Sequence, residues 1–358
     1  MEKSTKIEEE KYMRRCIELA GNGLCNVAPN PMVGAVIVCD GRIIGEGYHI
    51  RCGEAHAEVN AIRSVKDESL LKRSTIYVSL EPCSHYGKTP PCADLIIEKQ
   101  IPRIVIGCQD PFSEVAGRGI RKLRDAGREV VVGVLEEECK QLIRRFITFN
   151  TLHRPYITLK WAESADGFID KERTDGKPVI LSSPLTALLV HKKRAENDAI
   201  MVGRRTAMLD NPSLTVRNWY GRNPIRIVVD RTLSLSSDLQ LFDGSVPTLV
   251  FTEKGQPEKK EEKKNLTYIP IDFSHHPLPQ MMQELFQRKV QSLLVEGGSQ
   301  LLQSFIDNDL WDEAFIEKSP VRLHSGVKAP EICDKFSYVT EEYFSRPIRH
   351  YTRRNELK

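Results

Sequence analysis

Short apolar runs alternate with segments of helical periodicity along the chain, and this alternation limits the fold more than any other feature. In the first series the strand-like runs include "TIYVSLE", "RIVIGC" and "REVVVGVL", and the helical segments include "HAEVNAIRSV", "ADLIIEKQ" and "GIRKLRDAG". Before them, residues 7–20 have helical spacing, and two apolar runs flank Asp40-Gly41, a strong signal for a two-residue hairpin. This order predicts a three-layer α/β sandwich with a mixed sheet that ends near residue 150.

A second alternating series begins at "PYITLKWAESADGFI". It predicts strands at "DAIMVG", "PIRIVVD", "PTLVFT", "LTYIPI" and "SLLVEGG", and helices at "LTALLVHKKRAEN", "LPQMMQELFQRK" and "SQLLQSFIDNDL". Because 358 residues exceed what one ordinary core organises, we expect two domains, residues 1–150 and residues 151–358. The charged run "EKGQPEKKEEKKN" predicts a solvated loop between strands of the second domain.

Composition argues against several classes of protein. The chain has 52 basic and 49 acidic residues, a net charge of only +3, which gives no electrostatic reason to expect a nucleic-acid partner. No apolar run approaches the roughly 18–20 residues of a membrane span, and the first residues lack the apolar core of a signal peptide. The nine cysteines are odd in number and irregularly spaced, which favours reduced thiols. We therefore expect a cytoplasmic protein without a membrane partner.

One stretch of the first domain carries a metal-binding pattern. His56 and Glu58 stand at the start of a predicted helix, and Cys83 and Cys92 follow within "EPCSHYGKTPPC". Imidazole and thiolates bind zinc, and a catalytic zinc keeps three protein ligands and leaves the fourth position to water. A His-x-Glu pair followed by Pro-Cys is typical of zinc deaminases, in which zinc acidifies water to hydroxide and the glutamate moves protons. We predict His56, Cys83 and Cys92 as ligands and Glu58 as the proton shuttle.

The same residues also admit structural interpretations. Glu58 would be favoured in the first turn of any helix by the helix dipole. A closed, structural zinc site could recruit His85 or Cys52 as its fourth ligand. Eight residues separate Cys83 from Cys92, instead of the two in the simplest deaminase pattern. The catalytic interpretation is favoured because a structural zinc requires neither Glu58 nor the proline before Cys83.

The long spacing between the two cysteines resembles one family in particular. Its filler "SHYGKTPP", together with "NPMVGAVIV" and "GEAHAEVNAI", resembles the deaminase domain of the bifunctional deaminase-reductase family of riboflavin biosynthesis. The resemblance implies a cytidine-deaminase-like fold and deamination of 2,5-diamino-6-(5-phosphoribosylamino)pyrimidin-4-one. It implies that Asn30 and His49 line the substrate pocket and that Lys88 contacts the substrate. Apart from the resemblance, Asn30 is compatible with ordinary turn chemistry and Lys88 with a solvated side chain.

The second domain resembles the reductase half of the same family, which has a dihydrofolate-reductase-like α/β fold. The matching pieces, in order, are "ITLKWAESADGFI", "RAENDAIMVGRRTAMLDNPSLTVR", "PIRIVVD" and "LLVEGGSQLLQSF". The resemblance implies that NADPH reduces the ribosyl group of the substrate to ribityl. The substrate residues that it implies are Arg194, Leu214, Arg217 and Glu296. The cofactor residues that it implies are Ala162, Ser164, Thr206, Asp210, Gly297 and Gly298.

Physical chemistry supports part of this assignment and leaves alternatives. Guanidinium groups suit the phosphate of the substrate, and the amides where a strand runs through Gly297 and Gly298 into a helix can bind a cofactor phosphate. Arg194 could instead belong to a solvated basic helix face, and Asp210 to a turn. Pro178 and Ile180 stand where the family has a serine and a tryptophan, and the resemblance fades after about residue 318.

The combined expectation is a two-step enzyme that uses Zn²⁺ and NADPH on a small phosphorylated pyrimidine. A homo-oligomer and the preference for NADPH over NADH stay open. The alternatives are a stand-alone deaminase of tRNA or nucleosides, a zinc-stabilised nucleotide-binding module, and an active deaminase with a decayed or altered reductase half. The attached second domain argues against the first alternative, Glu58 argues against the second, and the departures at Pro178 and Ile180 motivate the third.

Overall fold

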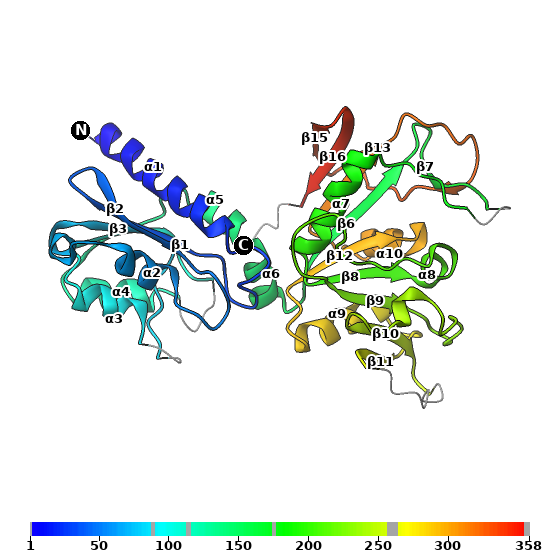
Figure 1. Cartoon of the computed structure of the whole chain (residues 1–358), viewed down its shortest axis with the longest axis horizontal. Coiled ribbons are helices and arrows are strands. Elements are labelled where there is room, and N and C mark those ends of the chain that lie inside the picture. The colour runs from blue at the N-terminus through cyan, green and yellow to red at the C-terminus, as the bar shows by residue number, and fades with distance from the viewer. Residues whose placement is uncertain (1, 87–89, 112–115, 174–176, 256–263, 354–358) are drawn as a thin grey trace. The chain divides into compact units, whose positions relative to one another are not determined.

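The computed structural model describes residues 2–86, 90–111, 116–173, 177–255 and 264–353, with the backbone alone for residues 2–5. Lys88 and most of the charged run 253–265 therefore lie outside the described residues. Contacts divide the chain into two compact units, unit 1 (Met1–His153) and unit 2 (Arg154–Lys358) (Figure 1). Within the described ranges, no helix is both long enough and apolar enough to cross a membrane.

One mixed sheet organises the described part of unit 1, with strand order β2-β1-β3-β4-β5. Its strands are β1 (Gly34–Cys39), β2 (Arg42–Tyr48), β3 (Thr75–Leu80), β4 (Arg103–Cys108) and β5 (Glu129–Val132). β1 pairs antiparallel with β2 and β3, whereas β3, β4 and β5 run parallel. The β1–β2 hairpin turns at Asp40 and Gly41, whose φ values are 49° and 73°. A two-residue turn requires such positive φ values, so the predicted hairpin is confirmed.

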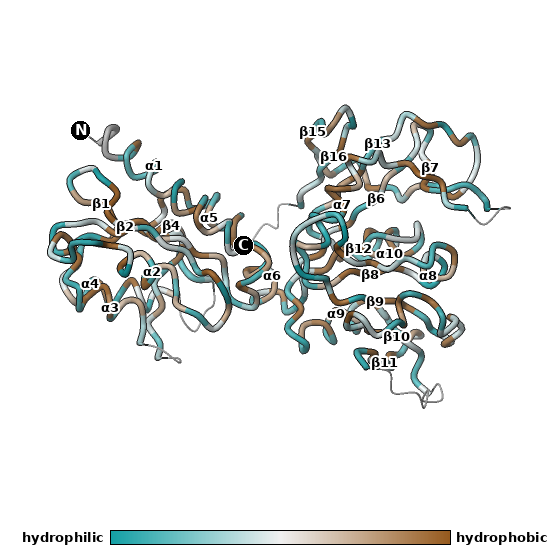
Figure 2. The backbone as a smooth tube through the Cα atoms, viewed as in Figure 1, coloured by the Kyte–Doolittle hydropathy of each residue, from teal (hydrophilic) through white to brown (hydrophobic). Residues whose placement is uncertain are grey.

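Helices cover both faces of this sheet. They are α1 (Glu2–Gly21), α2 (Ala57–Ser64), α3 (Cys92–Glu98), α4 (Arg118–Asp125), α5 (Glu136–Leu142), α6 (Arg144–Leu152) and the 3₁₀ turn η1 (Glu68–Arg73). Side chains of β1 alternate between two cores: Ala35 and Ile37 pack with α2, α3 and α4, and Val36 and Val38 pack with α1 and α5. The three-layer sandwich predicted from the alternation is therefore present, with hydrophobic residues concentrated along its strands (Figure 2).

The large sheet of unit 2 has the order β11-β10-β9-β8-β12-β6-β13-β16-β15 in the described residues. Its strands are β6 (Tyr156–Glu163), β8 (Ala199–Gly203), β9 (Ile225–Val229), β10 (Thr248–Glu253), β11 (Leu266–Ile271), β12 (Ser292–Gly297), β13 (Glu313–Lys318), β15 (Tyr338–Tyr343) and β16 (Arg346–Thr352). The strands from β11 to β13 run parallel, and β16 and β15 complete the edge antiparallel. The short strands β7 (Phe168–Asp170) and β14 (Val327–Lys328) pair separately.

Helices on both faces cover the parallel part of this sheet as well. They are α7 (Pro184–Glu196), α8 (Arg204–Asp210), α9 (Pro277–Gln287), α10 (Ser299–Asp307) and the 3₁₀ turn η2 (Gln240–Phe242). α7 begins at a capping box, in which Ser183 Oγ accepts from the Thr186 amide and Thr186 Oγ1 accepts from the Ser183 amide. Parallel sheets of this kind bind ligands beyond the carboxyl ends of their strands. We therefore expect a ligand site at the ends of β6, β8 and β12.

Several elements were not predicted from the sequence. α5 starts after Leu135, which has a left-handed backbone (φ 53°) and no side-chain cap, so the usual start signal is missing. The strand expected at residues 128–135 ends at Val132 because Gly133 turns the chain with φ 94°. α6, α8 and β13 were also not predicted. The exposed edge hairpin β15–β16 lacks a clear apolar alternation, so its pattern resembles a loop.

Candidate functional site

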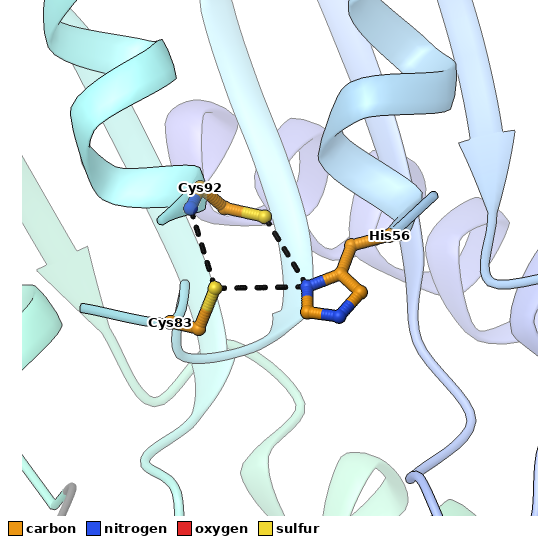
Figure 3. A group of neighbouring side chains, drawn as sticks. All are labelled: His56, Cys83 and Cys92. Atoms are coloured by element: carbon orange, nitrogen blue, oxygen red, sulfur yellow. Dashed lines mark hydrogen bonds between the residues drawn. The ribbon is translucent and has the colours of Figure 1, made fainter. Parts of the chain in front are cut away.

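Three predicted metal ligands meet at one point of unit 1. His56 caps the start of α2, Cys83 follows β3, and Cys92 is the first residue of α3. His56 Nδ1 lies 3.6 Å from Cys83 Sγ and 3.4 Å from Cys92 Sγ (Figure 3). A tetrahedral zinc with bonds of about 2.3 Å to sulfur and about 2.0 Å to nitrogen separates such atoms by about 3.5 Å. The three side chains therefore fit zinc without rearrangement.

The group has three ligands and no fourth among the described residues. All three ligand atoms lie within 4.8 Å of one another, and no other His, Cys, Asp or Glu of the described chain joins them. Cys52 is exposed and stands apart from this group, and His85 lines the adjoining cavity instead of completing the set. This arrangement fits an open, catalytic site better than the closed, structural site that the sequence left as an alternative.

Glu58 lies in the first turn of α2 and faces the same space. Its side chain is only 3% exposed. Burial, reinforced by the negative charge of a Cys83 thiolate, raises the pKa of Glu58 to about 7. The carboxyl group is thus held next to the metal ligands in an environment where it exchanges a proton near neutral pH.

A cavity of about 590 Å³ opens beside the metal ligands, and the predicted substrate residues Asn30 and His49 line it. His49 Nδ1 lies 3.1 Å from the Ala55 carbonyl, which can only accept, so this nitrogen carries a proton. Its Nε2 therefore accepts a hydrogen bond from the Asn30 side-chain nitrogen at 3.1 Å. This bond fixes the Asn30 amide group and leaves its oxygen available to another partner. Burial lowers the pKa of His49, in keeping with a neutral ring. The structure brings Asn30 and His49 together beside His56.

Glu81, two residues before Cys83, was not singled out in the sequence. Its buried carboxylate accepts hydrogen bonds from four backbone amides, those of Asp110 (3.2 Å), Gly117 (2.9 Å), Gly119 (2.9 Å) and Ile120 (3.2 Å). The segment after β3, which carries the metal ligand Cys83, is thereby joined to the start of α4. Asp110 and Arg118 also line the cavity, and they carry or adjoin the amides that Glu81 binds. The sequence analysis did not single them out. No local pattern reveals such a contact, because its partners lie 29 to 39 residues apart.

In unit 2 the predicted substrate residues converge at the carboxyl end of β12. Arg194 in the last turn of α7 binds both carboxylate oxygens of Glu296, at 3.0 and 2.6 Å. Arg194 also donates to the Thr215 carbonyl at 3.3 Å, and the exposed Arg217 donates to Thr215 Oγ1 at 3.2 Å. Arg194 is therefore not part of a solvated helix face. Both arginines gather around one short segment, at which Leu214 has a left-handed backbone (φ 52°) and a buried side chain.

Three of the predicted cofactor residues form a close-packed corner. Gly297 ends β12, and Gly298 precedes α10 with φ 81°. A Cβ at Gly297 would lie 2.9 Å from Thr206 Cγ2, and one at Gly298 would lie 3.4 Å from Thr206 Oγ1. A side chain at Gly297 would clash with Thr206, so this corner requires glycine for the strand end to pack against α8, and the amides that follow lie at the start of α10.

The remaining predicted cofactor residues have other partners. Ser164 is fully buried, and its hydroxyl donates to Asp166 at 2.6 Å and accepts from the Phe168 amide at 2.9 Å. Asp210 forms an ion pair with Arg173 at 2.5 Å. Ala162 lies near the carboxyl end of β6, opposite Glu317 of β13. A cofactor would therefore meet Ser164 through its backbone, since its hydroxyl holds the turn between β6 and β7.

Lys160 of β6 is a further residue that the sequence analysis missed. It lies next to the end of β12, since Leu159 pairs with Val295, and its side chain forms no hydrogen bond or ion pair with any residue that the structure describes. Burial lowers the pKa of Lys160, opposed by the nearby charges of Glu296 and Glu317. Together with Thr186 and Glu317, Lys160 lines a second cavity of about 130 Å³. An ammonium group held beside Glu296 is well placed to meet an anionic ligand.

The two departures from the family pattern lie on the surface of unit 2. Pro178 is exposed, and the side chain of Ile180 is 82% exposed. Ile180 therefore contributes little to the packed core of this unit.

Two family models match the chain, one over each unit. The cytidine and deoxycytidylate deaminase zinc-binding region matches residues 6–108, which include all three metal ligands. The RibD C-terminal domain matches residues 155–335. The assignment of a deaminase-like and a reductase-like fold to one chain, predicted from its motifs, is confirmed.

Relatives match along nearly the whole length. The riboflavin biosynthesis protein RibD of Bacillus amyloliquefaciens is 39% identical over 90% of this chain and 87% of its own length. The protein of the same name from Escherichia coli is 35% identical over 90% of both chains.

Solved structures agree in fold and in the arrangement of elements. The diaminohydroxyphosphoribosylaminopyrimidine deaminase/5-amino-6-(5-phosphoribosylamino)uracil reductase of Thermotoga maritima has a TM-score of 0.86 and 39% identity, and the match covers 97% of this chain and 99% of that one. RibD of Acinetobacter baumannii has the same TM-score at 30% identity and the same coverage. With these matches in sequence and structure over both units, the chain belongs to the RibD family of bifunctional riboflavin-biosynthesis enzymes.

Proposed function

We propose that the two activities of this family are divided between the two units of the chain. The enzyme is a zinc-dependent deaminase and an NADPH-dependent reductase of riboflavin biosynthesis, acting on a phosphorylated pyrimidine. Residues 1–150 carry out the deamination, and residues 151–358 carry out the reduction. The observation that carries this proposal is the open three-ligand group of His56, Cys83 and Cys92, with Glu58 beside it in a cavity of about 590 Å³. A cavity of this size holds a ligand as large as a nucleotide.

In the deaminase site each side chain has a separate task. His56, Cys83 and Cys92 would hold a zinc ion, which would supply Lewis acidity for the activation of a water molecule. The carboxyl group of Glu58 would accept a proton from water and donate it to the departing amino group, which would leave as ammonia. Its buried position in the cavity beside the metal ligands suits Glu58 for both transfers. Asn30, fixed by its hydrogen bond to His49, presents its amide oxygen to the ring substituents of the substrate.

In the reductase site the side chains bind and orient the substrate. NADPH would supply the hydride, and the Gly297–Gly298 corner beside Thr206 would hold its phosphates. Arg217 and Arg194 face the substrate phosphate from the segment around Thr215. Glu296, held by Arg194, meets the sugar hydroxyls next to Lys160. Ala162 and Ser164 lie at the end of β6 for the nicotinamide, and Asp210 positions the cofactor side of α8.

Direct product analysis tests this division. Purified enzyme is incubated with the diaminopyrimidine substrate with and without NADPH, and products are followed by mass. Deamination alone without NADPH, and deamination followed by a two-hydrogen gain with NADPH, is the expected result. A deaminated product that is never reduced would support the alternative of a decayed reductase half. No deamination in zinc-loaded enzyme would contradict the assignment of unit 1.

A further inference from the structure

We propose that Arg118 is the residue that recognises the phosphate of the substrate in the deaminase cavity. This inference rests on the proposed deaminase function of unit 1 and names a contact for its substrate. Among the described residues that line the cavity, Arg118 is the one arginine or lysine. A phosphate monoester carries nearly two negative charges at neutral pH, so the site requires a cationic partner.

Arg118 is free to bind an anion. Its side chain is exposed, and it forms no ion pair or hydrogen bond with any residue of the described ranges. The carboxylate of Glu81, which also lines the cavity, accepts from the amides of Gly117, Gly119 and Ile120 and forms no ion pair with Arg118. Those three amides lie before and after Arg118 in the chain, and we call their hydrogen bonds to Glu81 the Glu81 clamp. The Glu81 carboxylate is used by these amides and does not neutralise the Arg118 guanidinium group.

The Glu81 clamp also argues against phosphate binding by the backbone amides at the start of α4. The amides at the start of a helix often bind phosphate, but at the start of α4 the carboxylate of Glu81 already accepts from those of Gly119 and Ile120. With these two amides engaged, the start of α4 has fewer free amides for a phosphate, which favours recognition by a side chain. A guanidinium group can meet it with two parallel hydrogen bonds.

The backbone around Arg118 is built for this position. Gly117 has a left-handed backbone (φ 74°), and a Cβ at Gly119 would lie 2.1 Å from the Pro82 carbonyl oxygen. Both neighbours of Arg118 must therefore be glycine for the start of α4 to pack against the segment after β3 that carries Cys83. A cation at the first position of a helix is also unfavourable to the helix dipole. Such a position is explained when the side chain has a ligand to bind.

Arg121 provides a matched control. It lies three residues further along α4 and is also exposed, and its side chain forms no hydrogen bond or ion pair with the described residues, but it does not line the cavity. Arg118→Ala and Arg121→Ala thus remove the same charge from the same helix. A general effect of charge on the approach of an anionic substrate would appear in both variants.

The test compares the phosphorylated diaminopyrimidine substrate with its dephosphorylated form. Arg118→Ala should raise KM for the phosphorylated substrate by about 10- to 100-fold, the loss expected for a charged hydrogen-bonding partner. KM for the dephosphorylated form, zinc content and reduction of already deaminated substrate should be unchanged. Arg118→Lys should recover part of the loss, and Arg121→Ala should behave as wild type. An unchanged KM in Arg118→Ala, or an equal rise for both substrates, overturns the inference.

A binding measurement separates this inference from the proposed function. The Glu58→Gln enzyme, with zinc bound, is titrated with the phosphorylated and dephosphorylated compounds, with and without Arg118→Ala. Tighter binding of the phosphorylated compound that disappears with Arg118→Ala supports the inference. A preference for the phosphorylated compound that survives the substitution contradicts it. Failure of the wild-type enzyme to deaminate would instead count against the proposed function, while the binding result still decides the role of Arg118.

Discussion

Arg194 and Glu296 hold each other through two hydrogen bonds, of 3.0 and 2.6 Å, between positions 102 residues apart in the chain. Both side chains are largely buried, 12% and 9% exposed. The guanidinium group thus both orients the carboxylate and neutralises it. A substrate contact at either residue therefore depends on the other.

The pair should affect stability and reduction in separable ways. Arg194→Met leaves the Glu296 carboxylate buried without its counter-charge, which should cost about 3 kcal/mol of unfolding free energy. Arg194→Met/Glu296→Leu should regain most of that free energy because neither member of the pair is left buried without the other. Reduction should stay low in both variants. Denaturant unfolding and NADPH oxidation measure the two effects, and wild-type reduction by the double variant would show that the pair is only structural.

A substitution in the Gly297 corner should weaken NADPH binding without affecting deamination. Gly297→Ala places a methyl group 2.9 Å from Thr206 Cγ2, and relieving such an overlap costs about 1–3 kcal/mol. We expect KM for NADPH to rise and deamination to stay normal. Adding Thr206→Ser removes the methyl group in the way and keeps the hydroxyl, so it should recover part of the NADPH affinity. Equal NADPH affinity in wild type and Gly297→Ala would contradict the assignment of this corner.

Zinc should bind through the three ligands of unit 1. We expect about one zinc per chain, lost in Cys83→Ser and in Cys92→Ser and retained in Cys52→Ser, whose exposed thiol lies outside the group. Acid should release the metal because both thiolates and His56 must be deprotonated to bind it. Chelation should lower the melting temperature through loss of binding free energy. Metal analysis and thermal unfolding are the measurements, and full zinc content in both ligand variants would refute the site.

The sequence predicts the elements and residues whose signals are local. The Asp40-Gly41 hairpin is set by a turn that needs positive φ at two residues, and the helix that begins after His56 carries Glu58 in its first turn. Both therefore follow from neighbours in the chain. The family resemblance added the identity of the two folds, a deaminase-like fold followed by a reductase-like fold.

What the sequence could not reveal depends on contacts between distant segments. Glu81 accepts hydrogen bonds from backbone amides 29 to 39 residues away. Nearly every residue has a backbone amide, so the sequence does not show which amides are the partners. Arg194 stands in a run of basic residues, so its pairing with Glu296 is invisible until β12 and α7 are placed together. The lone position of Lys160 beside Glu296 likewise emerges only from the register of β6 with β12.

The central claim is that one chain carries two independent active sites, and a crossed assay of Glu58→Gln and Glu296→Gln tests it most directly. Each variant is assayed on the diaminopyrimidine substrate and on the already deaminated substrate with NADPH present. Glu58→Gln should keep its zinc, lose deamination by about 10²–10⁴-fold, the usual contribution of positioned proton transfer, and reduce normally. Glu296→Gln should deaminate normally and reduce poorly. Loss of both activities in either correctly folded variant would contradict the two-site account and indicate one shared active site.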